Sequence, residues 1–506
     1  MHTTIPAGLT ISDTEVDLLV VGSGTGLAAA LAAHEQGLSV LVIEKSSYVG
    51  GSTARSGGAL WLPASPVIEE QGGVDTPQRA SKYLRSVVGD SAPEQRSAAY
   101  LRHLPATVDM LRRTTPMKLF WARDYSDYHP EAPGGSAAGR TCECRPLNTA
   151  ILGEYLTDLR PGVMEVSIPM PTTGADYRWL NLMSRVPRKG LTTVIKRLAQ
   201  GIGGLALGRR YAAGGFDHDM EMRWKFQSES LGHNLSLGAR SNTCDAIRVG
   251  QDIGAGIALM DQSWWFPAVA PLPGATPAVM LAERSLPGSF IVDQTGRRFA
   301  NESADYMSFG QRVLELQAAS SPVETMWIVF DQQYRNSYVF AAELFPRMPI
   351  PQSWYDAGIA FRADNFTDLA AQINVPAGNF RATVEQFNEN AFAGEDPDFA
   401  RGRSAYDRYY GDPTVTPSPN LRPLLKGPFY AVKMVLSDLG TCGGLLADDH
   451  ARVLREDGTV IDGLYAIGNT AANAFGHTYP GAGATIAQGL VYGNIAAQHA
   501  AQRNTM

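Results

Sequence analysis

A cluster of glycines near the start of the sequence has the spacing of a dinucleotide-binding turn. Gly22, Gly24 and Gly26 follow the apolar run of residues 17–21, and an alanine-rich helical stretch begins directly after them. Glycines let the backbone approach a pyrophosphate closely, and the N-terminus of the following helix presents N–H groups and positive charge to it. The pattern therefore predicts binding of a dinucleotide.

Glu44 supplies the second part of this signature. It ends the apolar strand predicted at residues 39–44, about twenty residues after the glycines, where a carboxylate can accept hydrogen bonds from ribose hydroxyls. Residues 17–44 thus predict a strand, a helix and a parallel strand. A strict fingerprint has its third glycine at position 27, where Leu27 stands, so the helix is expected to start differently here. Both NAD and FAD can bind to such a unit.

The elements that follow indicate a second, α+β unit. A strand, turn and strand are predicted at residues 289–293 and 295–299, and another strand at 429–434. Helical periodicity predicts helices at residues 75–115, 190–207, 311–320, 365–373, 380–392 and 482–501. Residues 129–189 are rich in Pro and Gly and are expected to be irregular.

The bulk properties exclude several classes of protein. With 506 residues, 44% of them hydrophobic, the chain is expected to form two or more globular domains. The net charge of -7 and the absence of a basic run argue against a nucleic-acid partner. Four cysteines are too few for a disulfide framework, and Cys142 and Cys144 have no second pair at a zinc-like spacing, so no metal is expected. Without a secretory signal or a membrane span, we expect a cytoplasmic protein, and peripheral contact with the inner face of the membrane stays open.

Six motifs carry a resemblance to a known family. They are GSTARSGG at residues 51–58, SDYHPEAPGG at 126–135, MDQSWW at 260–265, NESADY at 301–306, SDLGTCGGL at 437–445 and HTYPGAG at 477–483. Together they resemble the bacterial 3-ketosteroid Δ1-dehydrogenases, which are related to the fumarate reductase flavoproteins. The resemblance implies an α/β fold: a discontinuous, Rossmann-like FAD-binding domain of the glutathione-reductase type at 1–266 and 440–506, with an inserted α+β catalytic domain at 267–439.

FAD is favoured over NAD because residues 463–469 are similar to the late strand and loop with which glutathione-reductase-type domains close over the flavin. The residues expected to bind FAD are Gly22, Ser23, Gly24, Thr25, Gly26, Glu44, Lys45, Gly51, Ser52, Thr53, Ser56, Gly57, Gly58, Gly468, Asn469, Gly483, Ala484 and Ile486.

The implied reaction is 1,2-desaturation of the A ring of a 3-ketosteroid, in which C2 loses a proton and C1 a hydride to flavin N5. By resemblance, Tyr479 and the N–H of Gly483 bind the C3 oxygen, Tyr306 is the base, and Tyr128 assists it. An unperturbed phenol has a pKa of about 10, so a base of this type needs assistance. Tyr125 lies one turn away from Tyr128 and is the alternative in that stretch.

Residues near these motifs receive weaker assignments. Trp264, Trp265 and Phe266 are candidates either for an apolar steroid pocket or for the core, and Asn301 and Glu302 are expected to orient the loop that carries Tyr306.

Three alternatives stay open. One is a fumarate-reductase-like enzyme, which would need cationic groups for dicarboxylates; another is a Δ4-type ketosteroid dehydrogenase. The third is a weakly active flavin- or steroid-binding variant, because the family carries several tens of additional residues where this chain has only 208–216. That segment would contribute strands and contacts at the adenine end of FAD, so we expect uncovered apolar side chains there and weaker cofactor binding. The resemblance suggests a quinone as the electron acceptor.

Overall fold

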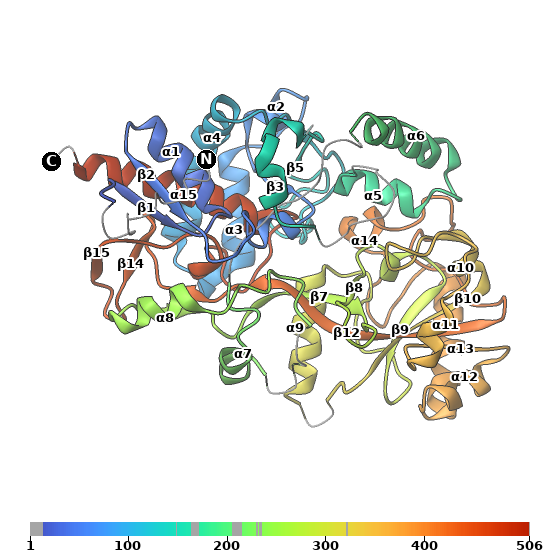
Figure 1. Cartoon of the computed structure of the whole chain (residues 1–506). Coiled ribbons are helices and arrows are strands. Elements are labelled where there is room, and N and C mark those ends of the chain that lie inside the picture. Colours follow the sequence, from blue (N-terminus) through green and yellow to red (C-terminus); the bar gives the residue numbers. More distant parts are fainter. Residues whose placement is uncertain are drawn as a thin grey trace.

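The computed structural model describes residues 14–147, 149–162, 172–204, 215–228, 231, 235–319 and 322–504. Within these residues, both ends of the chain lie together at one side of the molecule, and the elements between residues 263 and 441 form the other side (Figure 1).

The first elements are the predicted strand, helix and strand. β1 (Leu18–Val21) and β2 (Val40–Ile43) pair in parallel, with Leu18 opposite Val40, and α1 (Gly26–Glu35) connects them. The last helix, α15 (Ala484–Asn504), packs against α1 and against α4 (Glu94–Thr114). Small side chains make this approach possible, because the buried positions of α1 are all alanines. The C-terminal helix thus completes the unit that begins at residue 18.

The largest sheet contains six strands in the order β8-β7-β12-β10-β9, with β11 also paired to β12. Its bounds are β7 Ser263–Val269, β8 Ala278–Val279, β9 Ser289–Asp293, β10 Met326–Asp331, β11 Ala360–Ala363 and β12 Phe429–Thr441. β12 is the long central strand and pairs antiparallel with both β7 and β10. α12 (Phe366–Gln372) and α13 (Ala377–Ala393) share an apolar core with this sheet, and α9 (Tyr306–Gln317) packs on β7.

Smaller elements surround these two parts. The remaining strands are β3 Ala59–Trp61, β4 Leu119–Trp121, β5 Thr141–Cys144, β6 Ile257–Ala258, β13 Gly444–Leu445, β14 Arg452–Leu454 and β15 Val460–Tyr465. The remaining α-helices are α2 Pro66–Glu69, α3 Pro77–Val88, α5 Gly174–Asn181, α6 Pro187–Gly204, α7 Met220–Phe226, α8 Asp245–Asp252, α10 Gln332–Ser337, α11 Gln352–Asp356 and α14 Ala405–Tyr409. The 3-10 helices are η2 Thr53–Arg55, η3 Gly89–Ser91, η4 Thr149–Asp158, η5 Glu283–Ser285 and η6 Gly468–Thr470.

Two of the sequence predictions are wrong. Residues 295–299 form no strand: Asp293 accepts hydrogen bonds from the backbone and hydroxyl of Thr295, and Arg298 then enters ion pairs with Glu302 and Asp396 at 2.7 Å each. These polar contacts draw the segment away from the sheet. The stretch 129–189 is not wholly irregular either, since it contains β5 and α5.

One face of β1 is uncovered. Val20 faces α1 and is 8% exposed, whereas Leu19 and Val21, which point to the opposite face, are 48% and 67% exposed. Within the described residues, β1 and β2 form a sheet of two strands. Apolar side chains are therefore exposed at β1, as expected, and their link to the shortened segment stays a prediction. The expected shortening was assigned to residues 208–216, of which 208–214 lie outside the described residues.

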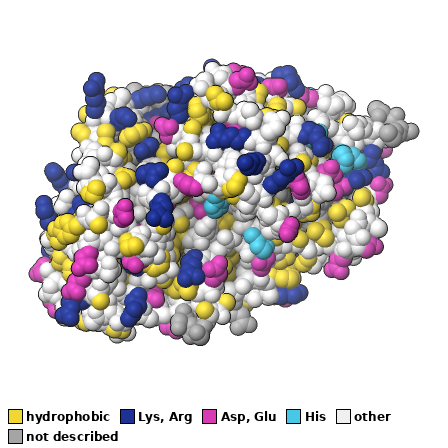
Figure 2. All heavy atoms as spheres, turned by 180° about the vertical axis from the view of Figure 1, so that it is seen from behind, with side chains coloured by type: hydrophobic (Ala, Val, Ile, Leu, Met, Phe, Trp, Pro, Cys, Tyr) yellow, Lys and Arg dark blue, Asp and Glu magenta, His cyan; other side chains and the backbone are white. Residues whose placement is uncertain are grey.

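The surface shows no large region of a single charge on the face seen in Figure 2, where basic and acidic side chains are interspersed. Across the described part of the chain, none of the helices combines the length and the apolar character needed to cross a membrane.

The contact between α1 and α15 yields a test of stability. A Cβ atom at Gly489 would lie 2.5 Å from Cγ2 of Thr25, so Gly489→Val is expected to overpack this contact at a cost of about 1–3 kcal/mol and to lower Tm by a few degrees. Calorimetric unfolding measures the shift. Gly378→Ala in α13 is the matched control, because a Cβ there meets no atom within 4 Å; an equal Tm for both variants would contradict the packing argument.

Candidate active site

The glycine turn ends β1 and leads directly into α1. Gly22 has φ +96°, which favours glycine, and a Cβ atom on Gly26 would lie 2.8 Å from the side chain of Val20. Gly26 is thus the glycine that lets the helix pack closely on the strand, which explains how Leu27 can stand at the fingerprint's third position. The side chain of Thr25 makes no capping hydrogen bond to any described group.

This uncapped helix end differs from others in the molecule. Thr76, Asp305 and Asn365 each accept a backbone N–H at the start of their helices. At α1 the N–H groups of Leu27 and Ala28 donate instead to the carbonyl oxygens of Gly24 and Thr25 at 3.1 and 3.0 Å, so none of the described side chains caps the helix N-terminus, and α1 has no acidic residue in its first turn. The turn therefore suits a phosphate group.

Glu44 joins the end of β2 to the glycine turn. Its carboxylate accepts hydrogen bonds from the N–H and the hydroxyl of Ser23 at 3.0 and 2.6 Å, and the N–H of Gly50 donates to the same hydroxyl at 2.6 Å. Oxygen lone pairs remain on the carboxylate for a further donor. Lys45 is directed elsewhere, since its ammonium is exposed and pairs with Asp245 at 2.6 Å.

The loop of residues 51–58 contacts a segment that the motifs did not identify. Gly51 has φ +45°. The hydroxyl of Ser52 accepts hydrogen bonds from the N–H of Ala239 and from the side-chain amide of Asn242, both at 2.8 Å. Thr53 begins η2, and residues 56–58 are exposed. Asn242 in turn binds the buried carboxylate of Asp217 at 2.9 Å, so residues 235–242 support the loop.

The C-terminal cofactor residues meet the same turn. Gly468 has φ +58°, and a Cβ atom there would lie 2.7 Å from the hydroxyl of Thr25. The side-chain oxygen of Asn469 accepts hydrogen bonds from Trp264 and Thr485, each at 3.3 Å. Ala484 and Ile486 are buried in the first turn of α15. Residues from both chain ends therefore converge on one place.

Three of the predicted catalytic residues form a single aromatic cluster. The ring centroids of Tyr128 and Tyr306 are 5.3 Å apart, those of Tyr128 and Tyr479 are 5.1 Å apart, and those of Tyr306 and Tyr479 are 5.5 Å apart. All three side chains are at most 5% exposed. Tyr125 does not belong to this cluster of three rings. It stacks instead on Tyr409, with the two ring centroids 4.6 Å apart.

Tyr479 and Gly483 are hydrogen-bonded to each other. The N–H of Gly483 donates to the Tyr479 hydroxyl at 3.3 Å. Gly483 has φ +87°, and a Cβ atom there would lie 2.1 Å from the carbonyl oxygen of Ala59, so only glycine fits. Two hydrogen-bond donors thus lie close enough together to serve one acceptor.

Burial controls the acidity of these hydroxyls. It raises the pKa of Tyr306 well above the ordinary value, and the neighbouring Tyr479 raises it further, whereas the Tyr128 hydroxyl lowers it. Burial also raises the pKa of Tyr479. The hydroxyl of Tyr128 is buried and has no hydrogen-bond partner among the described residues. An ionised Tyr306 therefore depends on donors such as Tyr128.

A buried ion pair holds Tyr128 in position. Asp127 accepts hydrogen bonds from the indole N–H of Trp61 at 2.9 Å and from the N–H of Ser136 at 3.0 Å, and it pairs with Arg140 at 2.5 Å. Burial raises the pKa of Asp127 to about 6. Because charges removed from water are expensive to separate, this network fixes the loop that carries Tyr128.

Strand β7 lines the cluster on one side. The ring of Trp264 lies 4.8 Å from that of Tyr479, and the ring of Phe266 lies 4.7 Å from that of Tyr306. Trp265 points to the other face of the strand, where it packs against Gly310 of α9.

Tyrosines of α14 form an outer layer that the motifs did not reveal. The ring of Tyr406 lies 4.9 Å from that of Tyr128, and the hydroxyl of Tyr410 donates to that of Tyr125 at 2.5 Å. The text YDRYY at residues 406–410 is the sequence signal that could have identified them. Asn301 and Glu302 bind Asp407 and Arg298, which agrees with a role in orienting this region.

A cavity reaches the cluster from outside. Its volume is about 320 Å³, and it is lined by Val87, His129, Ala132, Met307, Ser308, Gln311, His477, Thr478 and Tyr479. It provides a path by which a small molecule can approach Tyr479.

Comparison with known proteins identifies the family. Residues 17–202 and 210–486 match the FAD binding domain family. The chain is 39% identical to the 3-oxosteroid 1-dehydrogenase of Mycolicibacterium smegmatis over 552 positions, which cover 96% of each chain. The chain belongs to this FAD-binding family. FAD is its cofactor, and the uncapped helix, Gly22 and Glu44 fit its phosphate and ribose groups.

Other members of the family are similar over the same length. The 4-oxocyclohexanecarboxylate 2-dehydrogenase of Sinomonas cyclohexanicum is 34% identical over 95% of this chain and 92% of its own. The 3-ketosteroid Δ1-dehydrogenase of Sterolibacterium denitrificans, solved with 1,4-androstadiene-3,17-dione, superposes with a TM-score of 0.88 at 31% identity and covers 96% of this chain and 99% of its own. The mixed helix and sheet fold is thus that of FAD-binding flavoenzymes.

The relative from M. smegmatis has segments that this chain lacks, because the alignment of 552 positions is longer than the 506-residue chain. The family match is also interrupted between residues 202 and 210. Both findings agree with the expected shortening.

A buried carboxyl beside the site yields a prediction for pH. Glu143 lies opposite Ala59 in the β3–β5 pair and accepts a hydrogen bond from the N–H of Ala175 at 3.0 Å; burial raises its pKa from 4.5 to about 7. Since folding favours the protonated form, the contribution of Glu143 to stability is present below pH 4.5 and is lost as the pH rises through 7. The Tm of Glu143→Gln minus the Tm of the parent is therefore expected to be larger at pH 8 than at pH 5.

Differential scanning calorimetry at the two pH values measures this gain. The control is Glu389→Gln, an exposed glutamate of α13, whose Tm difference from the parent should not change. The same Tm difference for Glu143→Gln at both pH values would show that this carboxyl does not titrate as its burial indicates.

Proposed function

We propose that the chain catalyses FAD-dependent 1,2-desaturation of the A ring of 3-ketosteroids. The observation that carries the proposal is the convergence of Tyr128, Tyr306, Tyr479 and Gly483 beside the residues that suit FAD. It is supported by relatives named 3-oxosteroid 1-dehydrogenase at 39% and 38% identity, and by the similarity to a structure bound to an androstadienedione. The aromatic lining favours an apolar ring over a dicarboxylate, which disfavours the fumarate-reductase alternative.

The carbonyl of the substrate would be held by Tyr479 and Gly483. The N–H of Gly483 donates to the Tyr479 hydroxyl at 3.3 Å. A C3 oxygen that enters between them would accept from both donors, and these hydrogen bonds strengthen as enolate character develops on the oxygen. The pair thereby makes the C2 proton more acidic.

Tyr306 would accept the C2 proton. Burial disfavours its ionised form, so the base needs a donor, and the buried, unpartnered hydroxyl of Tyr128 supplies one nearby. FAD, held by the glycine turn at Gly22 and by Glu44, would supply the acceptor for the hydride that leaves C1. The role of the chain is to align the substrate, to move the proton and to exclude water.

The proposed domains are those that the family resemblance implies. Residues 1–266 and 440–506 would form a Rossmann-like FAD domain, which the parallel β1–α1–β2 unit supports, and residues 267–439 the catalytic insert. Both proposed boundaries fall within paired strands, β7 and β12, which would carry the chain between the domains.

We further propose a quinone as the electron acceptor and a peripheral contact with the cytoplasmic face of the membrane.

Anaerobic addition of androst-4-ene-3,17-dione to the purified, FAD-loaded protein tests the function. We expect bleaching of the oxidised flavin band and formation of the 1,4-diene. No bleaching would contradict the proposed activity.

Tyr306→Phe removes the proton acceptor and is expected to lower kcat by about a hundredfold or more with substrate binding kept. Tyr479→Phe is expected to lower kcat more than it raises KM.

Tyr355→Phe in α11 is the matched control and should leave turnover unchanged. Near-normal turnover of Tyr306→Phe would remove it from the base role, and an effect of Tyr479→Phe confined to KM would reduce Tyr479 to substrate binding.

The uncovered face of β1 predicts weaker retention of FAD. Leu19 and Val21 are 48% and 67% exposed, so insertion of the additional segment of the M. smegmatis relative after residue 207 is expected to raise Tm and to slow release of FAD. Thermal unfolding and flavin fluorescence after dilution measure the two effects. Turnover per bound FAD should not change; equal stability and equal FAD retention would show that the segment is dispensable.

A further inference from the structure

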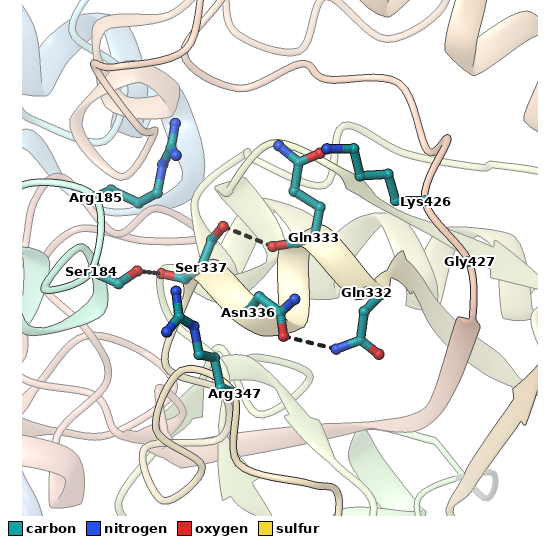
Figure 3. A pocket seen from close by; sticks show the side chains of 9 residues that line it. All are labelled: Ser184, Arg185, Gln332, Gln333, Asn336, Ser337, Arg347, Lys426 and Gly427. Carbon is teal, nitrogen blue, oxygen red and sulfur yellow. Dashed lines mark hydrogen bonds between the residues drawn. The ribbon is translucent and has the colours of Figure 1, made fainter.

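A second cavity lies in the part of the chain between residues 184 and 427, and the proposed catalytic roles do not use it. Its volume is about 400 Å³. The residues that line it are Ser184, Arg185, Gln332, Gln333, Asn336, Ser337, Arg347, Lys426 and Gly427. All are polar or glycine, three are cationic and none is acidic. Figure 3 shows that they come from four separate segments around one open space.

Two of the three cations have no counter-charge. Arg185 pairs with the buried carboxylate of Asp412 at 2.8 Å and also donates to Thr414. Arg347 and Lys426, in contrast, form no ion pair with a carboxylate of the described residues. The cavity therefore carries an excess of about two positive charges, because the charge of Arg185 is already offset.

A buried arginine builds the loop that presents Arg347. Arg335 is 2% exposed and donates to the carbonyl oxygens of Met348 and Tyr338 at 3.0 and 2.8 Å, and also to that of Phe345. The N–H of Arg347 donates back to the carbonyl of Arg335 at 3.1 Å. These bonds hold the loop from both sides.

The backbone of this loop is strained where it turns. The φ angles of Ala341, Ala342 and Arg347 are +53°, +59° and +69°. Residues other than glycine rarely adopt this left-handed region. Such conformations persist only where the surroundings determine them, and they are frequent at ligand sites. The strain and the Arg335 contacts together fix the backbone from which the exposed side chain of Arg347 extends.

The neutral side chains present donors to the cavity. The hydroxyl of Tyr430 donates to the side-chain oxygen of Gln332 at 2.6 Å, and the amide nitrogen of Gln332 donates to the oxygen of Asn336 at 2.8 Å. The acceptor of Asn336 is therefore occupied, and its NH2 group remains. Figure 3 shows the side chain of Arg347 extending from its loop toward Ser337.

We infer that this cavity binds a small oxyanion, either a phosphate or a molecule with several carboxylates. Positive charge in excess, N–H donors and the lack of apolar side chains match oxygen acceptors that carry negative charge and exclude the steroid as the occupant. The ligand would lie between Arg347, Lys426 and the amide of Asn336. This inference does not depend on the proposed dehydrogenase activity.

Isothermal titration calorimetry of the FAD-loaded protein at low ionic strength tests the inference. Inorganic phosphate and citrate are titrated separately, with sodium chloride of equal ionic strength as the blank. We expect saturable binding at one site for at least one of the two anions, and the stronger of them distinguishes a phosphate ligand from a polycarboxylate. Arg347→Ala and Lys426→Ala should each weaken binding about tenfold, as loss of a charge-assisted hydrogen bond does.

Arg362→Ala is the matched control, because Arg362 is an exposed arginine of β11 outside the cavity, and it should leave binding unchanged. Flavin absorbance is recorded during each titration. Absence of saturable binding, unchanged affinity in both cavity variants, or release of FAD by the anion would each overturn the inference, the last by assigning the anion to the cofactor site.

Discussion

The close contact between α1 and α15 is the constraint on which both the glycine turn and the hydrogen-bonded pair of Tyr479 and Gly483 depend. Gly489 and Gly468 lie directly against Thr25, and Gly493 lies against the backbone of Ala29. Thr25 directly precedes α1, and α15 begins next to Gly483. A larger side chain at this contact would displace the two ends of the site relative to each other.

The aromatic cluster combines two requirements that oppose each other. A dry cavity strengthens hydrogen bonds to a developing oxyanion, but the same burial makes a phenolate expensive. The fold meets both by surrounding Tyr306 with hydroxyl groups instead of charges, and by keeping the ion pair of Asp127 and Arg140 behind the loop. The charges of Asp127 and Arg140 are thus held one layer away from the ring of Tyr306.

Local patterns predicted the parts of the molecule in which neighbouring residues act together. The β1–α1–β2 unit was predicted to within one or two residues, because strand, glycine turn and alanine helix are contiguous. Family motifs located Tyr128, Tyr306 and Tyr479, which the structure brings together. The support of Ser52 by Asn242 could not be predicted, since it joins segments 190 residues apart. The failed strand at 295–299 has the same origin: the distant Asp396 attracts Arg298 away from the sheet.

The separation of the cofactor turn from its closing helix also has a consequence for biosynthesis. The ribosome completes Gly26 long before it reaches Ala484, and at roughly 5–20 residues per second the delay is on the order of tens of seconds. During that time the alanine face of α1 has no α15 to cover it. The nascent N-terminal unit must therefore remain unassembled or shielded by chaperones, and the flavin site is completed only when the last helix has left the ribosome.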